Sequence, residues 1–366
     1  MRELASVEVH VLVGEMQSLC GMYIKKFYDL GDGAFKFAVS GKEGTFLLYC
    51  KLLRTINLTS FTESAAQATN FAMAMRKRIE GSKIASVEQS GSDRIIIIRT
   101  LGHESFSIVI EMYGKGNVIL LDQSNMIVLA YKVMDQKNRT IRVKRAYEFP
   151  ATAPFEFGSE ENVDRLLEIM DGSEDRLITT LSSSLNLGPL YVEDIITSSG
   201  LSTSIKSLDY SQKKKLRHGI LMFYQKLKSE KPRIYIDGNG EYVDYAVVSI
   251  EKYSKYETLE FESLGSLLDK FYVGKRSEST READSKLEEL KASIEQQKEL
   301  IGKFEVEGVE YFEAGNTILN NMVEINQVIA YLRENKRATL EEVKSAFPGI
   351  KVDALDLKEK TIEIEM

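Results

Sequence analysis

Side chains that commonly catalyse reactions or bind metal ions are few and scattered in this sequence. The three histidines are His10, His103 and His218, and the two cysteines are Cys20 and Cys50. They do not stand at the close spacing that a zinc site requires, and two cysteines do not make a disulfide framework. The sequence also lacks a phosphate loop, a GxSxG motif and an HExxH motif. We therefore expect no metal site, no cofactor and no catalytic residue.

Basic residues are concentrated in two stretches, although the formal net charge of the chain is -7. The first stretch runs from Lys132 to Arg145, and the second runs from Lys206 to Arg233. Clustered lysine and arginine side chains neutralise phosphates, so both stretches are candidate nucleic-acid contacts. A solvated helix face explains either stretch equally well when it is taken alone. The candidate phosphate contacts are Lys132, Lys137, Arg139, Arg142, Lys144, Arg145, Lys213, Lys214, Lys215 and Arg217.

A helical hairpin is indicated between Leu185 and Ile196, with Gly188 and Pro189 at its turn. The stretch resembles a helix-hairpin-helix, in which a glycine turn lets amide groups at a helix end approach a phosphate backbone. A plain helical hairpin fits the same residues equally well.

The first 150 residues are expected to form the scaffold that carries the first basic stretch. Helices are expected over 6–20, with Ser6 as N-cap and Gly21 as its end, and over 63–80. Strands in succession, with helices that do not alternate with them, predict an α+β fold with antiparallel sheets. The runs that look like strands are 22–28, 35–39, 45–53, 83–88, 95–100, 105–111, 117–121 and 127–133.

Length and composition fit a folded protein of two or three domains. A change of character near Pro150 and Pro154 marks a linker, after which the pattern is helical over 160–230. A hairpin of strands 233–236 and 242–247 follows. We predict an N-terminal α+β domain (1–150), a helix-hairpin-helix domain (160–232), a small β-containing connector (233–275), a coiled-coil helix (280–335) and a small α/β tail (336–366).

The predicted coiled coil rests on a heptad seam of mostly apolar residues spaced three and four apart. A long helix lying on the body of the protein is the alternative. Because an apolar seam needs a partner, we expect it to be exposed or covered by a second copy in a homodimer. The seam consists of Leu287, Leu290, Ile294, Gln297, Ile301, Phe304, Gly308, Tyr311, Gly315, Ile318, Met322, Ile325, Ile329 and Leu332.

No run of eighteen apolar residues is present, and the first residues do not form a secretory signal. We expect a cytoplasmic protein with no membrane partner.

Motifs spread along the chain resemble the NFACT family of ribosome quality-control proteins, of the archaeal type. Bacterial relatives of this family are often labelled fibronectin- or fibrinogen-binding proteins. The order of the motifs carries the resemblance, which covers nearly the whole chain. The motifs are Ser6–Val9, Gly14–Met16, Ile24–Tyr28, Arg76–Lys77, Gly81, Val87–Arg94, Glu111, Gly114–Asp122, Arg142–Val143, Tyr147, Pro150, Glu262–Leu264, Leu268–Tyr272, Lys286–Leu287 and Gln296–Gln297.

The resemblance implies a first domain similar in fold to the N-terminal domain of formamidopyrimidine-DNA-glycosylase-like enzymes. It also implies binding to a large ribosomal subunit that carries peptidyl-tRNA. Further tRNA, expected to be alanine tRNA, would be recruited for mRNA-independent C-terminal tailing of the stalled chain. The family continues with a second coiled-coil helix and a C-terminal RNA-binding domain, so we expect this chain to be a fragment.

Peptidyl transfer would belong to the ribosome, so the chain itself is not expected to be an enzyme. Two other functions stay open: a general RNA- or DNA-binding scaffold without tailing activity, and a DNA glycosylase or lyase. Glycosylase chemistry uses an N-terminal amine, usually of a proline followed by glutamate. This chain has Arg2 in that place, and Glu3 alone does not restore the mechanism.

The resemblance also implies a tRNA-binding site. The family uses an Asp-Arg pair, matched by Asp93 and Arg94, and an aspartate in the first helix, where this chain has Glu8. Asp93 and Arg94 start a strand, so their side chains point to opposite faces and need not pair with each other. A turn-capping aspartate beside a surface arginine is the alternative. If the three residues form one site, Glu8 should lie on the same surface as the pair.

Overall fold

A computed structural model of the protein describes residues 2–42, 44–60, 68–136, 139–150, 157–170 and 175–365. Contacts divide the chain into two compact units, Met1–Arg276 and Ser277–Met366. The predicted α+β class with antiparallel sheets is confirmed, and helices follow the sheet along the chain. Among the described helices, none combines the length and the apolarity needed to cross a bilayer.

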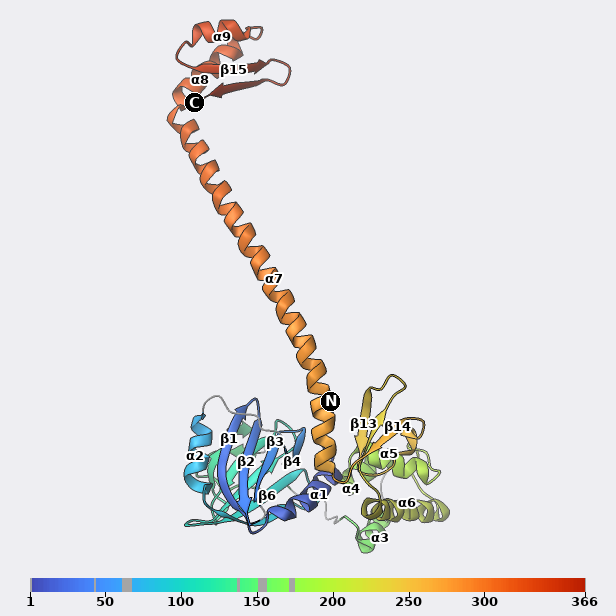
Figure 1. Ribbon diagram of the computed structural model, residues 1–366. Coiled ribbons are helices and arrows are strands. Elements are labelled where there is room, and N and C mark those ends of the chain that lie inside the picture. Colours follow the sequence, from blue (N-terminus) through green and yellow to red (C-terminus); the bar gives the residue numbers. More distant parts are fainter. Residues whose placement is uncertain are drawn as a thin grey trace. The chain divides into compact units, whose positions relative to one another are not determined.

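A nine-stranded sheet forms the larger part of the first unit (Figure 1). Most of its strands are half or fully buried apolar runs, as expected for a sheet with a core against it. In spatial order the strands are β4 (Thr55–Thr59), β3 (Gly44–Lys51), β2 (Ala34–Gly41), β1 (Tyr23–Gly31), β5 (Lys83–Gln89), β6 (Ile95–Leu101), β7 (Phe106–Glu111), β8 (Asn117–Leu121) and β9 (Ile127–Ala130).

The sheet is curved, so that residues from its two halves meet. The Tyr131 ring, just after β9, lies 4.9 Å from the Phe35 ring on β2, and its hydroxyl accepts a hydrogen bond from Gly33 N (3.3 Å). Helix α2 (Asn70–Ile79) packs there through Phe71. The helix predicted over 63–80 ends correctly but starts too early. Thr69 caps α2 by accepting a hydrogen bond from Ala72 N, and residues 61–67 lie outside the described residues.

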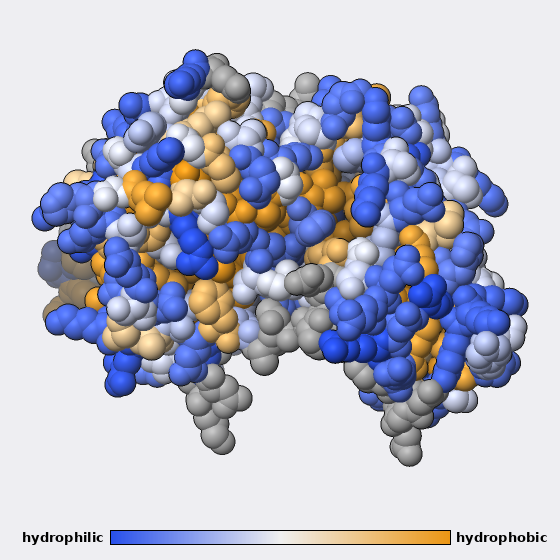
Figure 2. Space-filling view, turned by 90° about the horizontal axis from the view of Figure 1, so that it is seen from below, coloured by the Kyte–Doolittle hydropathy of each residue, from blue (hydrophilic) through white to orange (hydrophobic). Residues whose placement is uncertain are grey.

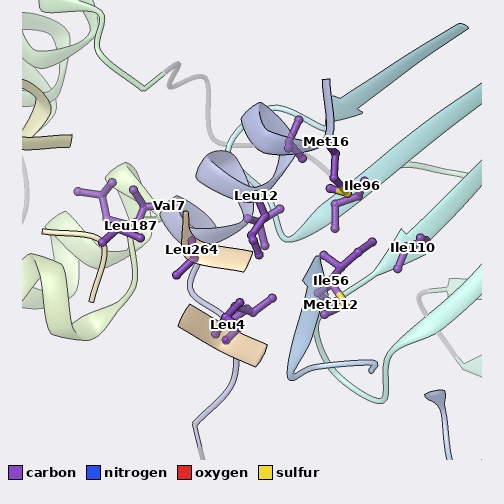
Figure 3. Packing of buried hydrophobic residues seen from close by; sticks show 14 of the residues in the cluster. Leu4, Val7, Leu12, Met16, Ile56, Ile96, Ile110, Met112, Leu187 and Leu264 are labelled. Carbon is purple, nitrogen blue, oxygen red and sulfur yellow. The ribbon is translucent and has the colours of Figure 1, made fainter. Parts of the chain in front are cut away.

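Helix α1 (Ser6–Glu15) lies between the sheet and the helices that follow it. In Figure 3, Val7 points toward Leu187 on one side, while Leu12 and Met16 lie toward the sheet residues. The residue that caps α1 is Ala5 rather than the predicted Ser6, because the Glu8 carboxylate accepts a hydrogen bond from Ala5 N (2.7 Å). A 3-10 helix (Met16–Leu19) continues α1.

The helical region and a small sheet complete the first unit. The helices are α3 (Glu160–Ile169), α4 (Leu177–Leu185), α5 (Pro189–Ser198) and α6 (Tyr210–Ser229). The strands are β12 (Arg233–Ile236), β13 (Tyr242–Ala246) and β14 (Glu257–Glu260), in the order β13-β12-β14. A two-stranded hairpin, β10 (Met134–Gln136) and β11 (Arg139–Ile141), follows β9. This hairpin was not predicted, and the strand predicted over 127–133 ends earlier, at Ala130.

Helix α7 (Leu264–Asn320) begins within the first unit, where Leu264, Leu267 and Leu268 are buried. The predicted coiled-coil helix of 280–335 is therefore too short at its start. It is also interrupted at Asn321, after which α8 (Met322–Glu334) begins. Within the second unit α8 packs through Val328 on α9 (Leu340–Ala346) and on the hairpin of β15 (Lys351–Asp356) and β16 (Thr361–Glu365).

The seam on α7 is apolar and exposed over the residues that the structure describes. Ile294, Ile301 and Ile318 are 52%, 56% and 56% exposed, and Phe304 is exposed as well. Ile325 on α8 is half-buried, and the side chain of Leu287 lies outside the described ones. The seam is therefore exposed along α7 and at Met322, the first residue of α8, whereas Ile325, Ile329 and Leu332 on α8 are half-buried.

Candidate functional site

Asp93 and Arg94 lie in the tight turn between β5 and β6. Asp93 N donates to Ser90 O (3.0 Å) and Ser90 N donates to Ile95 O (2.9 Å), which closes the turn. Both residues precede β6, which begins at Ile95, rather than starting the strand as expected, and their side chains diverge within the turn. Arg94 Nη1 donates to Glu3 Oε2 (2.6 Å) and to Leu4 O (3.3 Å), while the Asp93 carboxylate faces the helical region. The Arg94 side chain is 30% exposed, so part of its guanidinium can reach a ligand.

The Asp93 carboxylate is half-buried and only partly satisfied. Its Oδ1 accepts a hydrogen bond from Asn186 Nδ2 (3.0 Å), and its Oδ2 has no hydrogen-bond partner among the described residues. Burial raises the pKa of Asp93, and both the hydrogen bond from Asn186 and the charge of Arg94 oppose that rise. The site therefore contains one buried carboxylate oxygen that lacks a hydrogen-bond partner among the described residues.

Glu8 is fully buried, so the expectation that it shares a surface with Asp93 and Arg94 is wrong. Its carboxylate accepts hydrogen bonds from the Arg2 guanidinium (Nη1, 2.9 Å) and from the Tyr191 hydroxyl (2.6 Å). The physical reason is its position in the first turn of α1, where the side chain points back to the helix N-terminus. That end of α1 is enclosed by α5 and β13.

Arg2 links α1 to the small sheet. Its guanidinium forms a salt bridge with Glu8 and another with Asp244 (2.9 Å), and it donates to Tyr245 O (2.8 Å). It also stacks 4.1 Å from the centre of the Tyr245 ring. Arg2 thus joins α1 to β13 of the small sheet.

The α4–α5 turn contacts protein at the position where a helix-hairpin-helix would meet a phosphate. Gly188 has a φ of 103°, and a Cβ placed there would lie 2.7 Å from Ala5 Cβ. Leu187 is fully buried, and Asn186 Nδ2 donates to Ser92 O (2.6 Å). The turn therefore joins the helical region to α1 and to the loop that carries Asp93.

The candidate phosphate contacts of the first basic stretch, Lys132 to Arg145, lie in different environments in the structure. The Arg139 guanidinium pairs with the buried carboxylate of Glu111 and donates to the Tyr147 hydroxyl (3.1 Å). It is thus held by protein rather than exposed. Two others contact protein: Arg142 pairs with Asp135, and Lys132 donates to Lys115 O. Lys144 and Arg145 are exposed. Lys137 lies outside the described residues.

The second group lies on α6. Lys214 and Lys215 are exposed, and Lys213 is half-buried with an interaction of its own. Arg217 is bound by two carboxylates, Asp164 (2.6 Å) and Glu160 (3.3 Å). Figure 2 shows that hydrophilic residues cover most of the face on the side of α3 and α6. Lysines 214 and 215 are therefore the available members of this group.

Lys215 also lines a hollow of about 340 Å³ between α5 and α6, together with His218 and Lys226. The described residues contain no group of three or more histidine, cysteine, aspartate or glutamate side chains placed to hold a metal ion.

Several residues of the site were not found from the sequence. Asn186 and Tyr191 lie in the Leu185–Ile196 hairpin, but the sequence drew attention to its glycine turn and not to these two side chains. Glu111 did offer a signal, because it is the one charged residue in an otherwise uncharged strand, Phe106–Glu111, that is buried throughout. A buried carboxylate of that kind requires a partner, which Arg139 and Tyr147 provide.

Comparisons with known proteins extend these observations. The family model for NFACT N-terminal and middle domains matches residues 6–319. The archaeal Rqc2 homologue aRqcH of Methanocaldococcus jannaschii is 22% identical over 91% of this chain and 52% of its own length. The human ribosome quality control complex subunit NEMF is 22% identical over 73% of this chain and 27% of its own length.

The chain thus spans about half the length of the archaeal relative, and a smaller share of the human one. Among solved structures, the fibrinogen binding protein from Staphylococcus aureus matches with a TM-score of 0.58 and 20% identity. That match covers 73% of this chain and 98% of the other. It shows a shared fold.

Proposed function

The chain belongs to the NFACT family, and we propose from this membership that it acts in ribosome quality control. In this proposal it binds a large ribosomal subunit that carries peptidyl-tRNA. It recruits a further tRNA, expected to be alanine tRNA, for mRNA-independent C-terminal tailing of the stalled nascent chain. The name of the human relative, a subunit of the ribosome quality control complex, supports the assignment to this process.

The observation that carries the proposal is the Asp93-Arg94 turn within the matched region. Arg94 offers a partly exposed guanidinium, whose planar fork suits a phosphate or a base edge. Asp93 has a buried carboxylate oxygen without a partner among the described residues, an acceptor that would suit the amino group of a base that entered the site. Glu8 would act indirectly, because its carboxylate is buried and holds the N-terminus of α1 next to this turn.

Sequence-independent contacts with RNA are proposed for the exposed lysines and arginine of the two basic groups. Lys144 and Arg145 follow β11, and Lys214 and Lys215 lie on α6. Exposed cations of this kind bind phosphates by charge and release counterions, so their contribution should fall as salt rises.

The proposal makes the chain a binding protein and leaves peptidyl transfer to the ribosome. Position 2 holds an arginine, whose side chain is paired with Glu8 and Asp244, where glycosylases of the related fold have a proline. A glycosylase or lyase of the related fold would need a reactive amine at this end of the chain instead.

Purification of the tagged protein from cells, followed by gradient separation and sequencing of the bound tRNA, tests the proposal. We expect large subunits to be enriched over whole ribosomes, and one tRNA type to be enriched over total tRNA. A general RNA-binding scaffold would show neither preference. A lyase would instead form a covalent adduct with damaged DNA under reducing conditions.

A further inference from the structure

The turn between α4 and α5 contacts the loop that carries Asp93. Asn186, in this turn, donates from Nδ2 to Asp93 Oδ1 (3.0 Å) and to Ser92 O (2.6 Å). Its backbone is left-handed, with a φ of 51°. Asparagine and glycine adopt this conformation more readily than other residues. The backbone conformation at position 186 therefore favours asparagine, whose side-chain amide can donate hydrogen bonds to the Asp93 loop.

The turn is fixed in place, so the amide is presented in one position. Leu187 is fully buried, and Gly188 leaves no room for a side chain against Ala5. Ser92 is buried as well, and its carbonyl also accepts a hydrogen bond from Ser6 Oγ. The loop and the turn are thus held to each other and to α1.

The second carboxylate oxygen of Asp93 is left without a partner among the described residues, and so is the hydroxyl of Tyr113. Met112 N donates to Arg94 O (2.8 Å), which brings Asp93 and Tyr113 to facing positions beyond the ends of β6 and β7. Buried polar atoms without partners are few in folded proteins, and each calls for a water or a ligand. Asp93 and Tyr113, which carry two of these atoms, stand at opposite positions of the extended β6–β7 register.

We propose that Asn186 is a positioning residue of the tRNA site: it holds Asp93 Oδ1 so that Oδ2 is directed to the amino group of an unpaired base. This inference rests on the proposed function and adds the helical region to the recognition site. A carboxylate can accept from the amino group of a base, and such a contact discriminates only when the acceptor is held in place.

Two substitutions at Asn186 and one matched control test the inference. Asn186→Gly keeps the left-handed backbone and removes the amide without adding a charge, and Asn186→Asp keeps the size, removes the amide donor and places a second carboxylate beside Asp93. Asn125→Gly is the control, because Asn125 is exposed and has a φ of 58° in the turn between β8 and β9. Thermal unfolding establishes that each variant is folded. If Asn186→Gly is not folded, Asn186→Asp carries the test.

The informative measurement is the pH profile of binding to total deacylated tRNA with a fluorescent end label. The groups that act on the Asp93 carboxylate are Arg94, the neutral amide of Asn186 and, from the paired strand, Tyr113. Because the hydrogen bond from Asn186 lowers the pKa of Asp93, its loss raises that pKa further. We expect binding at neutral pH to weaken on the order of tenfold. The pH below which binding is lost should move upward, with no change for Asn125→Gly.

A purely structural role for Asn186 would lower the affinity equally at every pH, and this result would overturn the inference. If the unmodified chain binds no tRNA at all, the proposed function fails. Positioning is then tested separately by an NMR titration of the Asp93 carboxyl group. An Asp93 pKa that is the same in Asn186→Gly as in the original chain would contradict the role of Asn186.

Discussion

The Tyr191 hydroxyl donates a hydrogen bond to the Glu8 carboxylate across 2.6 Å, although 183 positions separate the two residues in the chain. Tyr191 is also fully buried, and burial together with the nearby Glu8 charge raises the pKa of Tyr191 well above its ordinary value. Tyr191 therefore stays protonated and donates. This bond joins the first helix to the helical region beside the turn that carries Asp93.

Replacing Glu8 with Ala should strongly destabilise the first unit. The substitution leaves the Arg2 guanidinium, which is 27% exposed, without its closest partner, and it deprives Tyr191 of its acceptor. Breaking a buried ion pair in this way costs about 3–5 kcal/mol of unfolding free energy. Urea denaturation followed by circular dichroism measures the change.

Glu88→Ala is the matched control, because Glu88 pairs with Arg99 on the surface, where both are nearly half exposed. Its effect should stay within about 1 kcal/mol. Equal effects of the two substitutions would contradict the role assigned to Glu8.

The start of α7 should respond to pH through Glu15. This carboxylate accepts hydrogen bonds from Leu264 N (2.6 Å) and Gly265 N (3.0 Å), and burial raises its pKa above the ordinary value of 4.5. A raised pKa means that the folded state holds the proton more tightly. The stability that this group contributes is complete below about pH 4.5 and declines as pH rises through the folded-state pKa.

The comparison with Glu15→Gln isolates this effect. The free energy of unfolding of the original chain, minus that of the variant, should decrease as pH rises from the ordinary glutamate range upward. Urea denaturation at a series of pH values gives the difference. A difference that stays flat, or that grows with pH, would show that Glu15 does not titrate as argued.

Lys214 and Lys215 should contribute to RNA binding without sequence preference. Replacing both with Ala should weaken binding to unrelated RNAs alike and reduce the steepness with which affinity falls as salt rises. A filter-binding series over several salt concentrations measures both quantities. Lys344 and Lys358, which are exposed in the second unit, provide the control double substitution to Ala. An unchanged salt dependence in the Lys214 and Lys215 variant would rule out phosphate contacts there.

The seam on α7 should drive self-association, with a second copy of the chain as its proposed partner. Ile301 and Ile318 are more than half exposed, and apolar seams of this period bury their side chains in a partner helix. Sedimentation equilibrium should show a dimer that is lost when both residues are changed to Asp. Lys303→Asp, at an exposed position away from the seam residue Ile301, should leave the dimer intact. A monomer at every concentration would contradict the homodimer.

The fold could be predicted from sequence where the pattern was local. Strand β8 was predicted with its bounds, because Asn117–Leu121 is an apolar run between turn residues. Strand β14 was missed, because each residue of Glu257–Glu260 is exposed and no apolar alternation marks it. Strand β4 was missed because Thr55–Thr59 follows the previous strand after a short turn, without a strong break in the sequence.

The candidate site could be predicted only in part, for a physical reason. The Asp93-Arg94 pair was identified through the family resemblance, but it was expected at the start of a strand and lies in the turn before β6. The burial of Glu8 depends on Tyr191 and on the small sheet, and the contact of Asp93 with Asn186 spans 93 positions. Contacts between residues so far apart in the chain produce no local sequence pattern from which they could be predicted.

The most direct test of the account is the recovery of tRNA and large subunits with a chain in which Asp93 and Arg94 are both changed to Ala. The Arg94–Glu3 pair is partly exposed, so its loss should cost about 0–1 kcal/mol of stability, whereas a bidentate contact to a base contributes about 1–3 kcal/mol. A double substitution of the surface pair Glu88 and Arg99 to Ala is the control. We predict that the Asp93 and Arg94 variant stays folded and binds large subunits, but recovers no tRNA. Recovery of tRNA at the level of the original chain, or unfolding of the variant before tRNA is lost, would contradict the account.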